Sequence, residues 1–326
     1  MKKSNEIEVS IIMSTYNESI SELSEAIYSI LNQTFKNFEF IIITDNPNNK
    51  QHIDYINKIK SMDERIVYLI NKNNIGLANS LNKGIEKAKG KYIVRMDADD
   101  ISMPDRIQKE YDILSSKNVD IVSTNKVDID ENGEIINLSA SLPQKHESIS
   151  KVLKYNSIIF HPTVMFKKES LKKIKFYRDF PCSQDYDMWL RAIDNNLKFE
   201  IIDEYLLKYR NRSNNISNSN AYKQWLMKKY ICKLSKERKK NNNIDTFSEE
   251  NMYQYLKKNG LYVEANNVNF KKGIDNFYKF KEKYKSKKYV FSVYYLCKSI
   301  FSHREIACYL YNFLIGTLIK RSGVKS

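Results

Sequence analysis

The segment "YIVRMDADD", from Tyr92 to Asp100, carries three carboxylates within four positions: Asp97, Asp99 and Asp100. Like charges at this spacing repel one another, and removing even one carboxylate from water is costly unless a cation compensates it. Mg²⁺ and Mn²⁺ prefer oxygen ligands, and they usually bind through one or two carboxylates together with substrate phosphates. The motif therefore indicates a divalent-metal site with a phosphorylated ligand, although many short acidic clusters are only solvated loops.

Two other loops carry residues suited to a nucleotide. Asp45 follows the apolar run 38–44, where a carboxylate can accept a hydrogen bond from the imide N–H of a uracil or from a ribose hydroxyl. Tyr16, in "STYN", offers an aromatic face for stacking on a base. Taken singly, Asp45 could cap a turn and Tyr16 could belong to the core. Their shared position after strands favours a common site.

The elements that must position these residues alternate between strand and helix patterns. Compact apolar runs typical of strands covered on both faces occur at 9–15, 38–44, 65–70 and 91–96. Ser19 and Glu22 form a capping box ahead of an apolar helical stripe, and a second helix, 77–88, is expected to close at Gly90. Such alternation predicts an α/β fold with a mostly parallel, Rossmann-like sheet flanked by helices, whose ligands bind at the carboxyl ends of the strands.

The chain beyond residue 100 predicts further elements and a boundary. We expect helices from Pro104, near 147–155 and within 183–196, and strands at 119–125, 162–166, 198–203 and 205–210, with a hairpin turn at Asn132 and Gly133. The polar tract 211–221 separates an α/β domain, residues 1–214, from a C-terminal region, residues 215–326. This region is expected to be helical near 221–240, 248–272, 274–288 and 289–320.

The formal net charge of +15 is concentrated in the C-terminal region. Residues 215–326 contain 23 basic and 8 acidic residues, which leaves 31 of each in residues 1–214. Its apolar run from Ile306 to Ile319 is too short to span a bilayer but suits a helix lying in the bilayer surface. We therefore expect peripheral attachment to an anionic membrane. The alternative is a helical bundle that packs on the α/β domain and exposes a solvated basic face.

Cysteine usage and the N-terminus narrow the cellular setting. Cys182, Cys232, Cys297 and Cys308 show no CxxC spacing, so neither a zinc site nor a disulfide framework is expected. The apolar run after Lys2 and Lys3 is too brief for a signal-peptide core, and no stretch reaches the roughly 18 apolar residues of a membrane span. We expect a cytoplasmic protein, located in part at the inner face of the cell membrane.

Five ordered blocks resemble the family 2 glycosyltransferases, which have the GT-A fold. The blocks are "IIMSTYNE", "EFIIITDNPNN", "NNIGLANSLNKGIEKAKGKYIVRMDADD", "HPTVMF" and "QDYDMWLR", and the resemblance extends from Val9 to about Ser217. It implies inverting transfer of a hexose or N-acetylhexosamine from a UDP-sugar. The implied acceptor is a hydroxyl of a growing glycan or lipid-linked oligosaccharide, as in capsule, O-antigen or lipooligosaccharide synthesis.

The resemblance also assigns residues to the donor. Ser14, Tyr16 and Asp45 would hold the uridine, and Asn74 with the neighbouring Gly76 loop would line the nucleotide site.

At the other end of the donor, Asp97 and Asp99 form the DxD motif of the family. Asp99 is the expected direct ligand of Mn²⁺ or Mg²⁺, Asp97 lies nearer the ribose, and Asp100 could share either task. Many relatives carry a histidine near the position of Arg212. Because arginine binds phosphate oxygens rather than metals, Arg212 and Arg210 are expected to help hold the diphosphate.

Inversion in one displacement requires a base that takes the proton of the acceptor hydroxyl. The family pattern places this base at Asp185, although the preceding Glu of the family is Gln184 here. Asp187 is the second choice of base. Trp189 shares a helical face with Asp185 and could contact a sugar or pack in the core. His161 matches a family block, but a lone histidine there is more often structural.

Two other functions compete with this interpretation. A nucleotidyl or phosphoryl transferase would be expected to carry a Gly-rich or P-loop motif, and none is present. A nucleic-acid-binding protein could use the lysines and tyrosines of the C-terminal region. Because the remainder of the chain is electroneutral and its pocket is acidic, nucleic acid is not expected as a partner.

Overall fold

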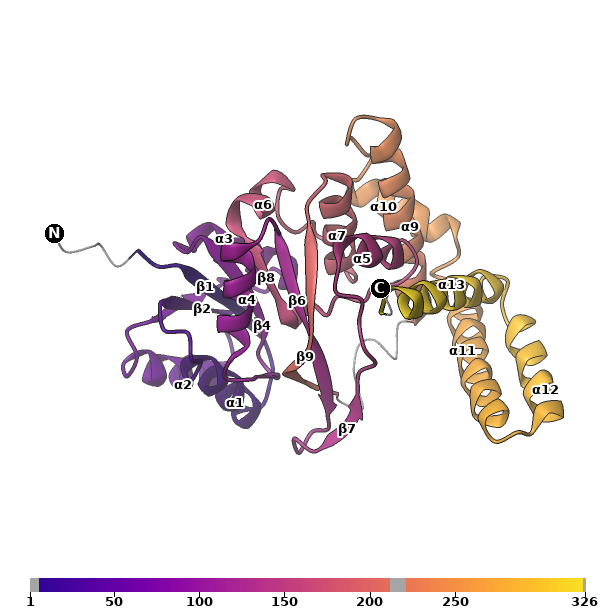
Figure 1. Cartoon of the computed structure of the whole chain (residues 1–326), viewed down its shortest axis with the longest axis horizontal. Coiled ribbons are helices and arrows are strands. Elements are labelled where there is room, and N and C mark those ends of the chain that lie inside the picture. The colour runs from indigo at the N-terminus through magenta and orange to yellow at the C-terminus, as the bar shows by residue number, and fades with distance from the viewer. Residues whose placement is uncertain (1–5, 212–220, 325–326) are drawn as a thin grey trace.

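The computed structural model describes residues 6–211 and 221–324 of the 326-residue chain. Its mixed sheet has the strand order β3-β2-β1-β4-β8-β6-β9-β5, and β7 pairs with β6. The first four strands in the chain are β1 (Val9–Thr15), β2 (Phe38–Thr44), β3 (Ile66–Ile70) and β4 (Tyr92–Asp97). They pair in parallel and are flanked by helices (Figure 1). The predicted α/β class and the four N-terminal strands are confirmed.

The second half of the sheet mixes strand directions. Its strands are β5 (Ile101–Ser102), β6 (Ile121–Ile129), β7 (Ile135–Leu138), β8 (Val164–Lys167) and β9 (Phe199–Arg210). β8 is antiparallel to both β4 and β6, whereas β9 is parallel to β6. The two strands expected at 198–203 and 205–210 are one strand, because irregular pairing near Asn125 accommodates the interruption. The predicted hairpin turn is confirmed between β6 and β7, where Gly133 has a φ of +88°.

The helices of residues 6–211 include all those expected, with two corrections, together with helices at 50–60 and 168–173 that the sequence interpretation did not predict. They are α1 (Ile20–Leu31), α2 (Lys50–Lys60), α3 (Leu77–Lys87), α4 (Arg106–Ser116), α5 (His146–Leu153), α6 (Lys168–Lys173) and α7 (Gln184–Asp194). The capping box of α1 is confirmed in both directions. Helix α4 begins two residues after Pro104, so Pro104 lies outside it.

Gly90 does not end helix α3, contrary to expectation. The helix ends at the cap residue Ala88. Gly90 instead passes so close to β1 that an added Cβ would lie 2.6 Å from the backbone nitrogen of Ser10. Its own N–H donates to Ser10 Oγ at 2.8 Å. The glycine is therefore required by the close approach of two backbones.

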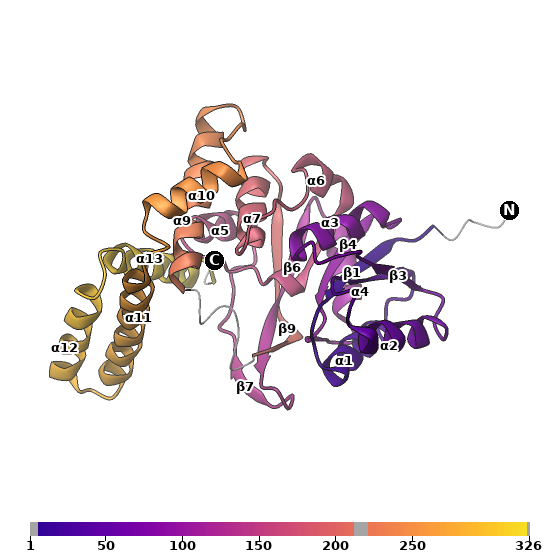
Figure 2. The same ribbon diagram turned by 180° about the vertical axis from the view of Figure 1, so that it is seen from behind.

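The C-terminal region is helical, as predicted, but its internal breaks differ. The helices are α9 (Ala221–Lys240), α10 (Glu249–Lys258), α11 (Glu264–Lys285), α12 (Tyr289–Ile300) and α13 (Ile306–Val324) (Figure 2). The chain turns at Gly260, which has a φ of +74°, whereas α11 continues through Gly273. Gly273 allows tight packing there, since an added Cβ would lie 2.4 Å from Ser302 Oγ. Within the described ranges, no helix has both the length and the apolarity needed to cross a membrane.

One apolar core extends from the sheet into the C-terminal helices. It includes Trp189 and Leu190 of α7 together with Trp225 and Leu226 of α9. The expected division at residue 214 therefore falls in the chain between two segments that share a core. A truncated chain ending there would expose this apolar surface.

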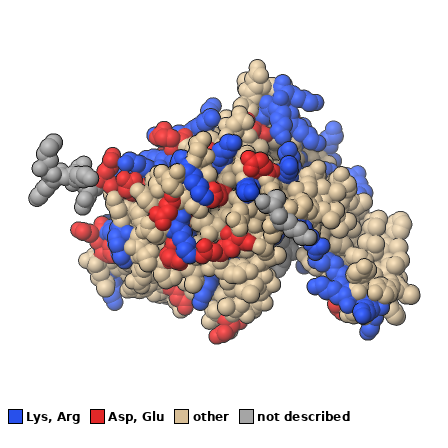
Figure 3. All heavy atoms as spheres, in the orientation of Figure 1, with Lys and Arg blue, Asp and Glu red and all other residues tan. Residues whose placement is uncertain are grey.

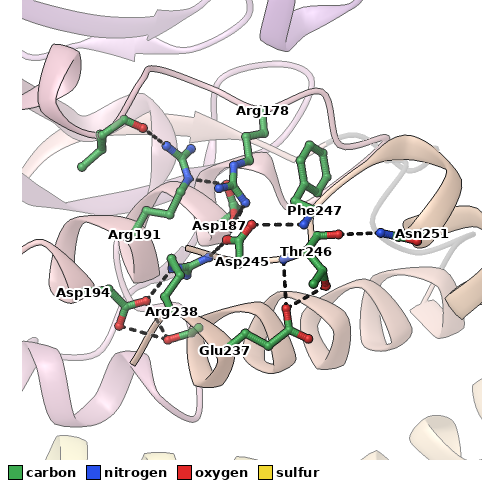
Figure 4. A network of polar contacts seen from close by, with 12 residues as sticks. Arg178, Asp187, Arg191, Asp194, Glu237, Arg238, Asp245, Thr246, Phe247 and Asn251 are labelled. Carbon is green, nitrogen blue, oxygen red and sulfur yellow. Dashed lines mark hydrogen bonds and ion pairs between the residues drawn. The ribbon is translucent and has the colours of Figure 1, made fainter. Parts of the chain in front are cut away.

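Buried charges reinforce the contact between α7 and α9. Arg238 of α9 donates to Asp194 of α7 at 2.8 Å and to Asp245 at 2.5 Å (Figure 4). Arg178 also binds Asp245, at 2.9 Å. Because Arg238, Asp194 and Asp245 are almost completely buried, each charge depends on its partners for compensation.

Candidate active site

The carboxyl ends of β1, β2 and β4 bring the predicted donor residues together. In the sheet register Ser14 lies directly beside Asp97 on β4. On the other side of β1, the backbone N–H of Asp45 donates to the carbonyl of Thr15 at 2.9 Å. Because neighbouring parallel strands end at the same edge, the loops that follow them line one region.

Asp45 fixes the loop that contains Asn74. Its carboxylate is buried and accepts from Asn71 Nδ2 at 2.7 Å, from Ile75 N at 3.0 Å and from Gly76 N at 2.9 Å. Asn74 Oδ1 also accepts from Gly76 N, at 2.9 Å. A carboxylate offers about four acceptor positions. Asp45 thus retains room for about one further hydrogen bond, such as one from a bound nucleotide.

Asn71 is a residue of this region that the sequence interpretation missed. Its side chain donates to Asp45 and to Ser80 Oγ, at 2.7 and 2.9 Å, and accepts from Lys83 Nζ at 2.7 Å. It thereby connects the end of β3 with helix α3. The asparagines in "NKNN", directly after the third strand, were the available signal.

The loop of Tyr16 is held by its backbone while the ring stays exposed. Glu18 accepts hydrogen bonds from Tyr16 N at 2.8 Å and from Thr15 Oγ1 at 2.6 Å. His52 supports the same loop through Thr15 and the carbonyl of Glu18. Since 44% of Tyr16 is accessible to solvent, the core alternative for this ring is wrong.

The three acidic residues after β4 form a cluster that suits a cation. One oxygen from each of Asp97, Asp99 and Asp100 lies within 4.8 Å of the others. Asp100 is buried; its Oδ1 accepts from Arg210 N at 2.9 Å, but its Oδ2 meets no hydrogen-bond donor within the described part of the chain. Burial, with repulsion from Asp97 and Asp99, raises the pKa of Asp100 well above its usual range. A divalent ion would remove this penalty, so the residues fit a metal.

Arg95 is a second residue that the sequence interpretation missed. Because side chains two apart on a strand share a face, Arg95 and Asp97 point the same way, and Arg95 Nη2 pairs with Asp97 Oδ1. The guanidinium is buried, and its Nε and Nη1 have no hydrogen-bond partner among the described residues. A charged residue inside the apolar strand "YIVRM" was the available signal.

Arg210 anchors the acidic loop from the other side. Its Nε donates to the carbonyl of Asp99 at 2.9 Å, and its Nη2 pairs with Glu25 at 2.5 Å. Another donor of Arg210 binds the carbonyl of Glu131 at 2.9 Å. An open hollow of about 480 Å³ adjoins this side chain. Arg210 is thus largely engaged within the protein, and Arg212, the other expected phosphate ligand, lies outside the described residues.

Asp185 lies in the first turn of α7 and shares the electrostatic environment of the acidic cluster. Its pKa is raised chiefly by burial and further by Asp97, whereas the N–H of Tyr186 and the charge of Arg95 oppose the rise. Ser183, the N-cap residue of α7, has a left-handed φ of +61°, which turns the chain into the helix. Asp185 can therefore accept a proton in a partly dehydrated site.

The comparison with known families agrees with this arrangement. Residues 10–175 match the family described as "Glycosyl transferase family 2". The chain belongs to this family.

Two relatives of this glycosyltransferase support the assignment. An uncharacterized glycosyltransferase of Methanocaldococcus jannaschii is 41% identical over 236 residues, covering 69% of this chain and 81% of the relative. The O-antigen biosynthesis glycosyltransferase WbnJ of Escherichia coli is 34% identical over 188 residues, covering 57% of this chain and 72% of WbnJ. The chain is therefore an enzyme of the glycosyltransferase class.

A solved structure shows the same fold. TarS 1-349 of S. aureus, in complex with UDP-GlcNAc, has a TM-score of 0.58 and 18% sequence identity, covering 92% of this chain and 90% of that one. Together with the family match, it confirms the expected GT-A fold.

Two other predicted residues of the glycosyltransferase are structural. Asp187, the second choice of base, is completely buried and pairs with Arg191 Nε at 2.7 Å and Arg178 at 3.8 Å. Trp189 is also completely buried, and its ring stacks on Phe166 at 5.8 Å between centroids. Neither side chain reaches solvent, so of the two alternatives for Trp189 core packing is confirmed and contact with a sugar or acceptor is wrong.

His161 packs against aromatic side chains of the glycosyltransferase. Its Nε2 lies 2.7 Å from Tyr177 Oη, and its ring meets Trp189 edge-on at 6.4 Å. Burial, and next the charge of Arg95, lower the pKa of His161 well below its usual range. A neutral imidazole packed among aromatic rings fits the structural alternative for this residue.

Proposed function

We propose that the glycosyltransferase moves a hexose or N-acetylhexosamine from a UDP-sugar to a hydroxyl of a growing glycan, with inversion and with Asp185 as base. The observation that carries this proposal is the convergence of the acidic cluster and Asp185 around Arg95. Arg95 pairs with Asp97 and acts electrostatically on Asp185. The test is a screen of UDP-glucose, UDP-galactose and their N-acetylamino forms for metal-dependent hydrolysis.

In this proposal the ends of β1 and β2 hold the nucleotide. Tyr16 stacks on the base, Ser14 and Asp45 bind the uridine, and Asn74 lines the same side. The exposed ring of Tyr16 and the remaining acceptor position of Asp45 support these roles. The UDP-GlcNAc bound to TarS, a protein of the same fold, supports a UDP-sugar as donor.

Asp97 and Asp99 would hold Mn²⁺ or Mg²⁺, with Asp100 close enough to assist. When bound, such an ion supplies Lewis-acid stabilisation of the negative charge on the departing diphosphate. The chain's own contribution is to keep this loop rigid, through Arg95 at Asp97 and Arg210 at the carbonyl of Asp99.

Asp185 would remove the proton from the acceptor hydroxyl as that oxygen attacks the anomeric carbon. Its raised pKa makes it a stronger base than an exposed aspartate. The N–H groups at the start of α7 bind its anionic form and orient it. The proton is transferred only when a hydroxyl lies within hydrogen-bond distance, so acceptor binding and deprotonation act together.

For the acceptor we propose a bacterial surface glycan, such as capsule, O-antigen or lipooligosaccharide, carried on a lipid. The relative WbnJ, an O-antigen biosynthesis glycosyltransferase, supports this class. We also propose that residues 1–214 carry the reaction, and that the basic residues 215–326 help place the enzyme at the inner face of the cell membrane.

Replacing Asp99 by asparagine is expected to weaken UDP binding in the presence of Mn²⁺ by about tenfold or more, because a neutral amide is a poorer ligand for a hard cation. Binding without metal should change little. Isothermal titration with UDP, with and without Mn²⁺, measures both. Glu64→Gln, which removes an exposed carboxylate elsewhere, is the matched control. Equal metal-dependent affinity in Asp99→Asn and the native enzyme would exclude Asp99 as a ligand.

The raised pKa of Asp185 predicts how kcat depends on pH on the acidic side of its optimum. A base must be deprotonated, so kcat should fall as pH decreases through this pKa, at a pH above the ordinary aspartate value of about 3.9. The profile should be measured with saturating donor and Mn²⁺. Replacing the base by glutamate should shift this fall in kcat to a different pH, whereas an unshifted fall would assign it to another group.

A further inference from the structure

Helix α12 buries small polar side chains and exposes large apolar ones. The side chains that it buries most completely are two serines, Ser292 and Ser299. Its large apolar side chains are instead exposed: Val290, Phe291, Val293, Tyr294 and Ile300, followed by Phe301. Val290 is 82% and Phe301 is 87% accessible to solvent. In soluble proteins a helix normally buries its apolar side chains and exposes its polar ones. The exposed apolar face of α12 is therefore suited to a partner.

This distribution follows from how α12 packs on α11. Ser299 Oγ donates to the carbonyl of Gly273 at 2.7 Å, within a seam of small residues. Small side chains let the two helices approach closely, and the bulky side chains are thereby directed outward. The exposure of the apolar face of α12 is therefore a consequence of how the hairpin packs.

Lysines gather beside this apolar face. The segment 279–288, which ends α11 and turns into α12, contains six lysines and one acidic residue, Glu282. The hairpin projects from the end of the molecule opposite β1 to β3 (Figures 1 and 2). Figure 3 shows basic side chains at its tip and an uncharged surface beyond them. An apolar helix face flanked by lysines matches the surface of an anionic bilayer.

We propose that the α11–α12 hairpin is the membrane-docking element of this enzyme, with Val290, Phe291 and Phe301 inserted among lipid head groups and the lysines facing anionic phosphates. At 12 residues α12 is too short to span the hydrocarbon core, so it lies in the interface. A second copy of the chain is the weaker occupant, because it would bring two lysine-rich tips together. The inference rests on the membrane placement in the proposed function and names the surface responsible.

The sequence interpretation placed this contact in Ile306–Ile319 instead, and in the structure part of that segment packs within the protein. Helix α13 buries Ile306, Leu310 and Gly316. An added Cβ on Gly316 would lie 2.2 Å from Asn156 Nδ2, close to α5. Helix α13 thus buries some of its apolar side chains and exposes others, among them Leu314 and Leu318, whereas α12 buries two serines and leaves its largest apolar side chains exposed.

The test is co-sedimentation of the full chain with vesicles of phosphatidylcholine, alone or mixed with phosphatidylglycerol. The native enzyme should bind the anionic vesicles preferentially, and added salt should weaken this binding. The triple variant Val290→Ser, Phe291→Ser and Phe301→Ser should reduce binding at least about tenfold, since three exposed anchors are lost. The control is Met62→Ser with Ile244→Ser, which removes exposed apolar side chains elsewhere.

A second variant addresses charge. Lys283→Gln, Lys285→Gln and Lys287→Gln should lower binding to anionic vesicles, whereas Lys58→Gln with Lys60→Gln should not. Hydrolysis of the UDP-sugar by both hairpin variants should match the native enzyme, which separates a failure of docking from a failure of the proposed reaction. Undiminished vesicle binding by the apolar variant would overturn the inference. The inference would also be overturned if the native enzyme were a dimer that the apolar variant converted to a monomer. Binding of the native enzyme to single-stranded DNA but not to vesicles would overturn it as well.

Discussion

Replacing Asp185 by asparagine is expected to lower kcat by about 10²–10⁴-fold, the usual contribution of a general base. The substitution keeps the size of the side chain but removes its capacity to take a proton. Affinity for UDP should stay nearly unchanged, because Asp185 lies on α7, whereas the residues proposed to bind the nucleotide follow β1 and β2. Rates at saturating donor and acceptor, with UDP titration, measure both quantities.

The stability of Asp185→Asn must be measured as a control, to separate a loss of catalysis from a loss of folding. Asp185 lies in the first turn of its helix, and its burial favours the neutral form. Asp185→Asn should therefore unfold at a denaturant concentration no lower than that of the native enzyme. Turnover near the native rate would refute the assignment of the base. A loss of turnover together with a large loss of stability would show that Asp185 is structural.

The parts of the fold that the sequence predicted depend on local patterns. The four N-terminal strands are short apolar runs, and the capping box of Ser19 and Glu22 needs only two suitable side chains three residues apart. The order of these elements then places Ser14, Asp45 and Asp97 at one edge of the sheet. The sheet edge that we propose as the donor side of the site could therefore be located from sequence without knowledge of any contact.

The parts that the sequence did not predict depend on contacts between distant segments. Periodicity places Asp185 and Trp189 on one helical face, but it cannot say that this face meets Phe166 rather than a ligand. The link from Arg95 to Asp185 requires the packing of α7 against the sheet. Similarly, composition identified an apolar basic C-terminal region, but only the packing of Gly273 against Ser299 shows which helix exposes its apolar side.

Replacing Asp187 by asparagine is expected to give the opposite result to Asp185→Asn. Asp187 is completely buried and accepts from Arg191 Nε at 2.7 Å, with Arg178 at 3.8 Å (Figure 4). Neutralising it leaves two guanidinium groups without this counter-charge, and breaking a buried pair in this way costs about 3–5 kcal/mol. The free energy of unfolding should fall by about 3 kcal/mol, near the lower end, because the amide oxygen can still accept one hydrogen bond.

This pair of variants separates catalysis from folding within one helical turn. Asp187→Asn should retain near-native kcat per folded molecule, because its side chain is completely buried and has no path to the acceptor. Urea unfolding followed by circular dichroism gives the stability, and the active fraction is taken from UDP titration. If Asp187→Asn kept native stability but lost turnover, the buried charges around Arg191 would serve the reaction rather than the stability of the fold.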